Sequence, residues 1–344
     1  MRTSNVHDSN ILVLRGHEVA SLLAGRENEL IEVTRKAYEA HAACDSSLPQ
    51  STFLRFPDQP RQRIIALPAY LGNGFEVAGI KWISSFPSNL SKGMDRASAI
   101  IILNSAQTGR PQAIIEGSII SSKRTAASAA LAAKTLQQGR QASRVGIIGC
   151  GPINFEVVRF LLASDPEINE LLLFDLDTAR ADRFKEACHK LSGDISVGIV
   201  KGVSAALEGA TLISLATTAL QPHINDLSAC APNSALLHIS LRDLAPEAIL
   251  SSDNVVDDID HVCRAQTSVH LAEQIAGNRD FIRCTLADIT SGRAAPRKND
   301  DGIAVFSPFG LGVLDIAVGQ FVYELAQERQ QGTVIQSFLP DPWS

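Results

Sequence analysis

Two glycines near the middle of the chain stand between a strand-like and a helix-like segment. Residues 144–148 have the apolar character of a short buried strand, Gly149 and Gly151 mark a turn, and residues 152–163 show the apolar spacing of a helix. Gly149 allows a sharp turn, Gly151 lets a pyrophosphate approach the backbone, and the N–H groups at the start of the helix then face the anion. Asn154 replaces the third glycine of the usual GxGxxG pattern. The spacing therefore predicts the phosphate-binding corner of a dinucleotide fold.

An acidic residue follows the next apolar segment. Residues 171–174 are apolar and lead to Asp175, 26 positions after Gly149. A carboxylate at this position accepts hydrogen bonds from an adenosine ribose and repels a 2′-phosphate. The pattern predicts NAD rather than NADP as the cofactor. The alternative is a βαβ unit that binds no nucleotide.

A nicotinamide cofactor implies hydride transfer, which requires a group that moves protons. Lys81 lies in GIKWISSFP, between Ile80 and Trp82. Burying an ammonium group is costly, and desolvation would lower its pKa and make it a usable general acid or base. The alternative is a surface lysine whose aliphatic stem covers apolar surface.

Three further residues have side chains suited to holding or protonating a substrate. Arg55 in TFLRFP and Arg124 at the start of an alanine-rich segment carry guanidinium groups, which bind carboxylates through two hydrogen bonds. Asp243 in HISLRDLAP follows a strand and could line the cleft at the carboxyl end of a parallel sheet. Surface ion pairs and a loop-capping aspartate are the alternatives. His238 lies in an apolar strand, where we expect a structural role.

Hydrophobic periodicity predicts the elements that position these residues. Helices are expected over residues 17–41, 123–136 and 313–330, with Gly139 as a C-cap after the second. In the first part of the chain, strands are predicted at residues 63–67, 76–84, 98–104 and 112–116, the last two joined as a hairpin by the turn signal at residues 108–111. Later strands, separated by helix-compatible or loop segments, are predicted at residues 195–200, 211–216, 235–240, 254–257 and 303–306.

The order of these elements predicts two domains, which a chain of 344 residues is long enough to form. The fold class is α/β, with a Rossmann-like NAD domain inserted in a discontinuous α+β domain. The expected boundaries are 1–138 for the first part of the outer domain, 139–306 for the Rossmann-like domain and 307–344 for a C-terminal segment that returns to the first domain. Residues 291–301, rich in charge, Gly and Pro, are expected to form an exposed loop.

Composition and charge argue against several classes of partner. The formal net charge is −6 and no basic tract is present, so no nucleic-acid partner is expected. The first residues show no signal-peptide core and no apolar run approaches the roughly 18 residues that span a bilayer, so we expect a cytoplasmic protein with no membrane partner. The six cysteines form no CxxC pair, which favours buried reduced thiols over a metal site or disulfides.

Taken together, these segments resemble the ornithine cyclodeaminase/μ-crystallin family over nearly the whole chain. The resemblance rests on GIKWISSFP, residues 98–136, VGIIGCGPINFEVVRF and the loop near Asp243. It implies a substrate-binding domain that forms a homodimer, joined to a Rossmann-like NAD(P) domain. It also implies that Lys81 transfers protons or activates water, that Arg55 and Arg124 bind the substrate carboxylate and that Asp243 is a catalytic acid. The loop at Asp243 departs from the family's DxPGK pattern, and FSPFG at residues 306–310 replaces the usual FKSxG.

Details such as KGMDRASA and EGSIISSKRTAAS most closely resemble the 2,3-diaminopropionate biosynthesis branch of this family. The resemblance implies an NAD-dependent oxidoreductase that acts on a secondary amine C–N bond. With water, it would convert N-(2-amino-2-carboxyethyl)-L-glutamate to L-2,3-diaminopropionate and 2-oxoglutarate, for siderophore or peptide antibiotic biosynthesis. Arg96, in KGMDRASA, is a further expected substrate ligand. The residues expected to bind the cofactor are Gly149, Gly151, Pro152, Ile153, Asp175 and Thr217.

Three other activities remain open from the sequence. An ornithine cyclodeaminase would keep its NADH and cyclise ornithine, and the altered loop at Asp243 counts against it. A simple amino-acid dehydrogenase or ketimine reductase would act on a smaller substrate. A non-catalytic NAD(P)-binding protein of the μ-crystallin type would be favoured by loss of Lys81 or Arg124, and both are present.

Overall fold

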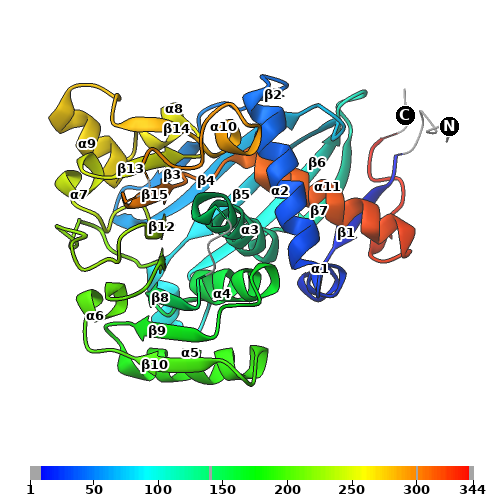
Figure 1. The fold of residues 1–344 in the computed structure, drawn as a ribbon. Helices are drawn as coiled ribbons and strands as arrows, with labels where there is room; N and C mark the ends of the chain where they lie inside the picture. Colours follow the sequence, from blue (N-terminus) through cyan, green and yellow to red (C-terminus); the bar gives the residue numbers. More distant parts are fainter. Residues whose placement is uncertain (1–8, 139–141, 300, 341–344) are drawn as a thin grey trace. The chain divides into compact units, whose positions relative to one another are not determined.

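The computed structural model describes residues 9–138, 142–299 and 301–340 and forms two compact units (Figure 1). Unit 1 comprises Met1–Arg26, Ala43–Ser121 and Gly312–Ser344, and unit 2 comprises Glu27–Ala42 and Ser122–Leu311. The predicted C-cap at Gly139 lies outside the described residues. No helix in the described part of the chain has the length and apolar character of a membrane-spanning segment.

Unit 1 is built on a mixed sheet in the order β16-β1-β7-β6-β5-β4-β2, with β3 paired to β4. The turn signal at residues 108–111 joins β6 and β7 as the expected antiparallel hairpin. The strands are β1 (Ile11–Leu14), β2 (Ser46–Ser47), β3 (Thr52–Phe56), β4 (Gln59–Leu71), β5 (Val77–Ser85), β6 (Ala97–Ser105), β7 (Pro111–Glu116) and β16 (Thr333–Ile335). The helices are α1 (Gly16–Leu23), a 3₁₀-helix (Pro87–Lys92) and α11 (Gly312–Glu328).

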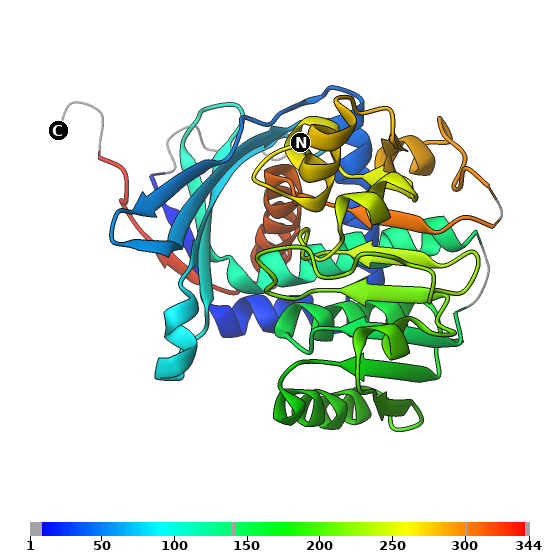
Figure 2. The ribbon, with the colours of Figure 1, turned by 90° about the vertical axis from the view of Figure 1, so that its left-hand side faces the viewer.

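Helix α11 covers one face of this sheet, and Figure 2 shows it lying against the curved strands β4, β5 and β6. The helix approaches closely because two positions carry no side chain: a Cβ at Gly79 would lie 3.2 Å from Ile316, and one at Gly312 would lie 3.1 Å from the carbonyl of Leu67. The C-terminal helix therefore packs on strands from the first part of the chain, within unit 1.

Unit 2 contains a sheet of eight parallel strands among its described residues, in the order β10-β9-β8-β11-β12-β15-β13-β14. The strands are β8 (Arg144–Ile148), β9 (Glu170–Phe174), β10 (Ser196–Ile199), β11 (Leu212–Leu215), β12 (Ala235–His238), β13 (Asp253–Val256), β14 (Ile282–Thr285) and β15 (Ala304–Ser307). The helices are α2 (Glu27–Ala42), α3 (Ser118–Gln137), α4 (Pro152–Ser164), α5 (Thr178–Leu191), α6 (Val203–Leu207), α7 (Pro246–Leu250), α8 (Ile259–Val262), α9 (Ser268–Ala276) and α10 (Leu286–Thr290).

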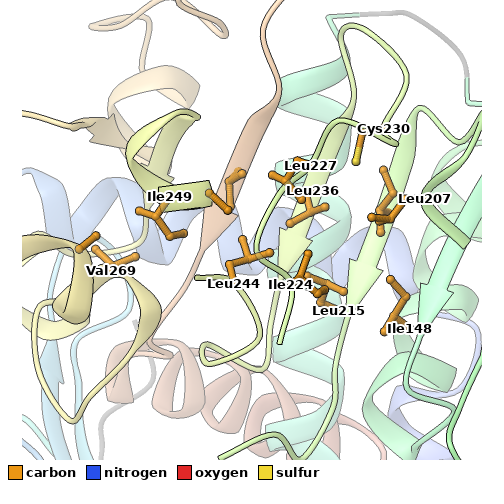
Figure 3. Packing of buried hydrophobic residues seen from close by; sticks show 14 of the residues in the cluster. Ile148, Leu207, Leu215, Ile224, Leu227, Cys230, Leu236, Leu244, Ile249 and Val269 are labelled. Atoms are coloured by element: carbon orange, nitrogen blue, oxygen red, sulfur yellow. The ribbon is translucent and has the colours of Figure 1, made fainter. Parts of the chain in front are cut away.

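A buried apolar cluster holds this parallel sheet to the segments around it. Figure 3 shows Leu215 and Leu236 from neighbouring strands packed beside Ile224 and Leu244 from the loops that follow them. Burial of such side chains contributes about 1.5–3 kcal/mol each. The loops at the carboxyl ends of β11 and β12 are therefore anchored by their own apolar residues, which keeps their polar residues in fixed places.

The unit boundaries differ from the expected 138/139 and 306/307. The first falls inside α3, after Ser121, and the last falls at Leu311/Gly312. Helix α2 and the part of α3 beyond Ser121 belong to unit 2, because Tyr38 on α2 is hydrogen-bonded to Ser128 on α3 at 2.7 Å and Lys123 forms an ion pair with Glu156 on α4 at 3.2 Å. The helical periodicity of α3 is continuous across the boundary, so the sequence carries no signal of it.

Candidate active site

The glycine turn of unit 2 has the geometry of a phosphate-binding corner. Gly149 has φ +90°, and a Cβ there would lie 2.5 Å from the carbonyl oxygen of Ala216. Gly151 is the N-cap of α4, offers no side-chain oxygen to the first turn and has open space where its Cβ would be. Pro152 begins the helix with a fixed φ and no N–H, which leaves the N–H of Ile153 at the exposed end of the helix dipole. The residues present therefore fit the pyrophosphate of a dinucleotide.

Asn154 takes over the packing role of the missing third glycine by hydrogen bonding. Its side chain is fully buried, donates to the carbonyls of Ile148 and Gly149 at 2.9 and 2.7 Å and accepts the hydroxyl of Ser214 at 2.7 Å. The start of α4 is thereby held to β8 and β11, the two strands between which the chain order reverses. In parallel α/β sheets this switch point is where ligands bind.

Asp175 directly follows β9, beside the same turn. Its carboxylate accepts the N–H of Cys150 at 2.8 Å and the N–H of Asp177 at 2.9 Å. Cys150 itself is buried, and burial raises the pKa of its thiol to about 12, in agreement with a packing role. Asp175 thus shapes the turn and places a negative charge beside it, where a 2′-phosphate would be repelled.

Asp243 lies at the centre of a hydrogen-bonded group at the ends of β11 and β12. Its side chain is fully buried, and its carboxylate accepts the hydroxyl groups of Thr217 and Ser240. His223 Nε2 lies 3.0 Å from Oδ1, and His238 Nε2 lies 3.5 Å from Oδ2. Burial opposes ionisation, but His238 and the two hydroxyl groups outweigh it and hold the pKa of Asp243 below its usual range. The group is therefore a carboxylate at neutral pH that accepts hydrogen bonds, and its role as a catalytic acid stays a prediction.

Arg124 lies in unit 2 and is almost fully buried. Its guanidinium packs against Gly310, where a Cβ would come within 2.9 Å of Nη1. Gly310 has φ +91°, a conformation that favours glycine, and its N–H donates to Asp257 Oδ2 at 2.7 Å. The FSPFG segment, which lacks the family's usual lysine, thus forms part of the wall behind Arg124.

Lys81 forms a buried ion pair in unit 1. Its Nζ lies 2.6 Å from Asp315 Oδ2 and donates to Ser121 Oγ at 3.3 Å, and the two charged side chains are 3% and 0% exposed. An opposite charge at this distance favours the ammonium form and opposes the desolvation expected from the sequence. The buried position of Lys81 is confirmed, and the surface alternative is wrong. Asp315, 234 positions away on α11, was missed because no local pattern marks it.

Arg55 lies on the same face of the unit 1 sheet as Lys81. The strand register pairs Arg55 with Arg63 and Arg63 with Ser85, which is four residues from Lys81 along β5. Since side chains alternate between the faces of a strand, Arg55, Arg63 and Lys81 share one face. Sequence reasoning did not single out Arg63, although this residue lies on a predicted strand.

Arg96 lies just before β6 and is exposed. Its carbonyl accepts the N–H of Phe86 at 2.7 Å, and the Phe86 ring contacts Phe56, which follows Arg55. The segments that carry Arg55 and Arg96 are therefore near each other, while the described contacts show neither arginine bound to Lys81. Their roles in binding substrate stay predictions.

The sequence was compared with known protein families and with characterised proteins. Residues 12–330 match the model of the ornithine cyclodeaminase/mu-crystallin family. The chain belongs to this family. It is 28% identical over 334 residues to N-((2S)-2-amino-2-carboxyethyl)-L-glutamate dehydrogenase of Staphylococcus aureus, covering 95% of this chain and 99% of that one.

Two solved structures of the family match over nearly the whole chain. One is Δ(1)-pyrroline-2-carboxylate reductase of Thermococcus litoralis in complex with NADH and L-proline, with a TM-score of 0.87, 25% identity and coverage of 94% of this chain and 99% of that chain. The other is an archaeal alanine dehydrogenase dimer with bound NAD, with a TM-score of 0.85, 26% identity and coverage of 95% and 99%. These relatives confirm the expected fold class, a Rossmann-like domain joined to a second domain, and agree with NAD as the cofactor.

The carboxylate of Asp175 should set the choice between NAD and NADP. We expect Asp175→Ser to narrow the preference for NAD at least tenfold, because close repulsion of a 2′-phosphate is worth about 1–3 kcal/mol. Dissociation constants for NADH and NADPH, measured by fluorescence titration, test this. Asp182→Ser, which removes an exposed carboxylate from α5, should keep the wild-type ratio. An unchanged ratio in Asp175→Ser would show that the residue only shapes the turn.

Removal of Lys81 should affect stability and turnover separately. Lys81→Met removes the ammonium group that pairs with the buried carboxylate of Asp315, so we expect the free energy of unfolding to fall by about 3–5 kcal/mol and NADH formation to fall about 10²–10⁴-fold. The double variant Lys81→Met/Asp315→Leu should regain stability in urea denaturation while staying inactive. Lys92→Met, at an exposed lysine, is the control. Substantial activity in either Lys81 variant would disprove the proton-transfer role.

Proposed function

We propose that this protein is an NAD-dependent dehydrogenase that oxidises N-(2-amino-2-carboxyethyl)-L-glutamate and hydrolyses the product to L-2,3-diaminopropionate and 2-oxoglutarate. The similarity to the staphylococcal dehydrogenase supports the substrate, and the fit of the glycine turn supports the cofactor. A cytoplasmic location and a supply of diaminopropionate to siderophore or peptide antibiotic assembly belong to the same proposal.

The observation that carries this proposal is the pairing of Arg55 with Arg63 on the face of the sheet that holds Lys81. Like charges directly opposite each other on neighbouring strands destabilise a sheet, and an anionic ligand on this face would offset that repulsion. The proposed substrate bears three carboxylates. Ornithine has a cationic side chain, which the same face would repel.

The proposal assigns a task to residues of each unit taken by itself. In unit 1, Arg55 and Arg96 are assigned to carboxylate binding, and Lys81, paired with Asp315, is assigned to donate a hydrogen bond or a proton to the substrate. In unit 2, Arg124 is assigned to carboxylate binding, and the Asp243 group holds the loops beside the glycine turn. Bound NAD would supply the hydride acceptor for oxidation at the glutamate Cα, and Gly149, Gly151 and Ile153 would hold its pyrophosphate.

The substrate is tested by incubating the protein with NAD and each candidate amino acid. We expect NADH, L-2,3-diaminopropionate and 2-oxoglutarate from N-(2-amino-2-carboxyethyl)-L-glutamate, and little or no NADH from alanine or ornithine. Arg124→Ala should raise KM and lower kcat together, because a lost charge-assisted contact costs about 1.5–3 kcal/mol and misplaces the Cα–H. Proline and ammonia from ornithine without net NADH would contradict the proposal in favour of a cyclodeaminase, and NADH binding with no product from any amino acid would favour a binding protein.

We further infer that the protein forms a homodimer through the opposite face of the unit 1 sheet. Trp82 and Ile100 are direct cross-strand neighbours on that face and are 38% and 42% exposed, and Leu54 on β3 is 43% exposed. Large apolar side chains gathered on one open sheet face are typical of an interface. The archaeal alanine dehydrogenase relative is a dimer.

A charge on this face should separate the subunits. We expect Trp82→Glu to shift the sedimentation coefficient from that of a dimer to that of a monomer, with an unchanged circular dichroism spectrum, because burying a carboxylate in an apolar interface is costly. Leu220→Glu, at a 71% exposed leucine of unit 2, should leave the dimer intact. If wild type and Trp82→Glu sediment alike, the dimer does not use this face.

A further inference from the structure

His223 has a half-exposed imidazole that is held from behind by a buried carboxylate. Its side chain is 39% exposed, its Nε2 lies 3.0 Å from Asp243 Oδ1, and Asp243 is fully buried. We propose that His223 is a proton-transfer residue of this enzyme, with Asp243 as the residue that positions it. The assignment rests on the proposed function and deepens it.

The hydrogen bond to Asp243 decides which ring nitrogen is available for chemistry. Because an ionised carboxylate only accepts, the Nε2 of His223 carries the hydrogen and Nδ1 carries the lone pair of the neutral ring. Among the residues that the structure describes, Nδ1 has no hydrogen-bond partner. The arrangement of a basic nitrogen on one side of the ring and a buried carboxylate on the other is that of a general base with its orienting acid.

Two backbone features fix the position of the ring. The N–H groups of His223 and Ile224 both donate to the carbonyl oxygen of Asp243 at 2.9 Å, and the side chain of Ile224 is buried in the core cluster (Figure 3). Leu241, two residues before Asp243, has φ +70°, which is uncommon for a bulky residue. Strained backbone of this kind persists where surrounding structure enforces it and gathers at functional sites.

The histidine lies at the edge of the sheet where the cofactor site is expected. Thr217, which donates to Asp243, directly follows Ala216, whose carbonyl oxygen contacts the Gly149 turn. The His223 and Asp243 loops and the phosphate-binding turn therefore leave the sheet along the same edge, within unit 2. A group at this place is positioned to act near a nicotinamide rather than near a distant surface.

His238 shows what a histidine with a structural role looks like beside the same carboxylate. It also lies beside Asp243, but its ring is fully buried and its Nδ1 is hydrogen-bonded to Ser307 at 3.1 Å. The Asp243 carboxylate has the hydroxyl groups of Thr217 and Ser240 as further donors. A half-exposed second imidazole is therefore not needed to satisfy the buried charge, which favours a chemical role for it.

Loss of the Cα hydride leaves a protonated C=N bond; the oxygen of a water attacks its carbon while His223 Nδ1 takes one proton from that water, and the C=N bond becomes a C–N bond. His223 then returns this proton to the nitrogen. The C–N bond breaks with its electron pair on nitrogen, the remaining hydroxyl proton passes through the imidazole to the leaving amine, and a ketone and an ammonium group result.

The test compares His223→Ala and His223→Asn with His189→Ala, which alters an exposed histidine on α5 of the same unit. We expect kcat to fall about 10²–10⁴-fold in both His223 variants, with the NADH dissociation constant within twofold of wild type. Free imidazole should restore at least tenfold of the lost rate to His223→Ala, whose side-chain space is open, and little to His223→Asn. His189→Ala should match wild type. Retention of more than half of kcat, or a loss that imidazole does not relieve, would overturn the assignment.

A second measurement separates this assignment from the choice of substrate. Diethyl pyrocarbonate acylates neutral imidazole, and mass spectrometry locates the modified residue. We expect His223 to be labelled in the free protein and protected by NADH with 2-oxoglutarate, while His189 is labelled equally in both. Protection of His223 in a protein that fails to oxidise N-(2-amino-2-carboxyethyl)-L-glutamate would support the site and reject the proposed substrate. Equal labelling of His223 with and without these ligands would reject the site.

Discussion

The parallel direction of every strand in the unit 2 sheet decides where its chemistry is located. Each strand ends at the same edge, so the residues that follow β8, β9, β11 and β12 leave the sheet together although they are far apart in sequence. Gly149, Asp175, Thr217 and Asp243 each follow one of these strands within five residues. A parallel sheet also buries both faces, which leaves this edge and its loops as the places where polar side chains can meet a ligand.

Both units bury charged groups, and burial costs each group its hydration free energy. The structure offsets this cost differently at each site. Lys81 and Asp315 neutralise each other across two elements of unit 1. Asp243 is held ionised by hydroxyl and imidazole neighbours. A buried ion pair seldom adds stability compared with apolar residues of the same size, because desolvation takes most of the Coulombic gain. Retaining such groups in apolar surroundings therefore points to chemistry rather than to folding as the reason for their presence.

Local sequence signals predicted much of the fold. The features that they did not predict depend on contacts between residues far apart in sequence. The β6–β7 hairpin and the glycine turn were predictable because the turn residues and flanking strands are adjacent in sequence. The partnership of Lys81 with Asp315 was not, since only the packing of α11 on the sheet brings the two together. Residues 291–301 were expected to be an exposed loop, yet Arg297 is 5% exposed and donates to the carbonyls of Leu136 and Asn233. Composition alone cannot reveal that Arg297 donates hydrogen bonds to carbonyl oxygens of segments distant in sequence.

The FSPFG segment, which differs from the family's usual FKSxG, is held in place by a buried carboxylate. Asp257 directly follows β13 and is almost fully buried, and its carboxylate accepts the N–H groups of Phe309 and Gly310 at 2.8 and 2.7 Å. Burial raises the pKa of Asp257, and these backbone hydrogen bonds oppose that rise. The two bonds hold Gly310 in its left-handed conformation against the guanidinium of Arg124. The segment has no lysine, but its backbone lies against Arg124 with no side chain between them. The position of Arg124 on α3 thus depends on the Asp257 carboxylate, which follows a strand distant in sequence.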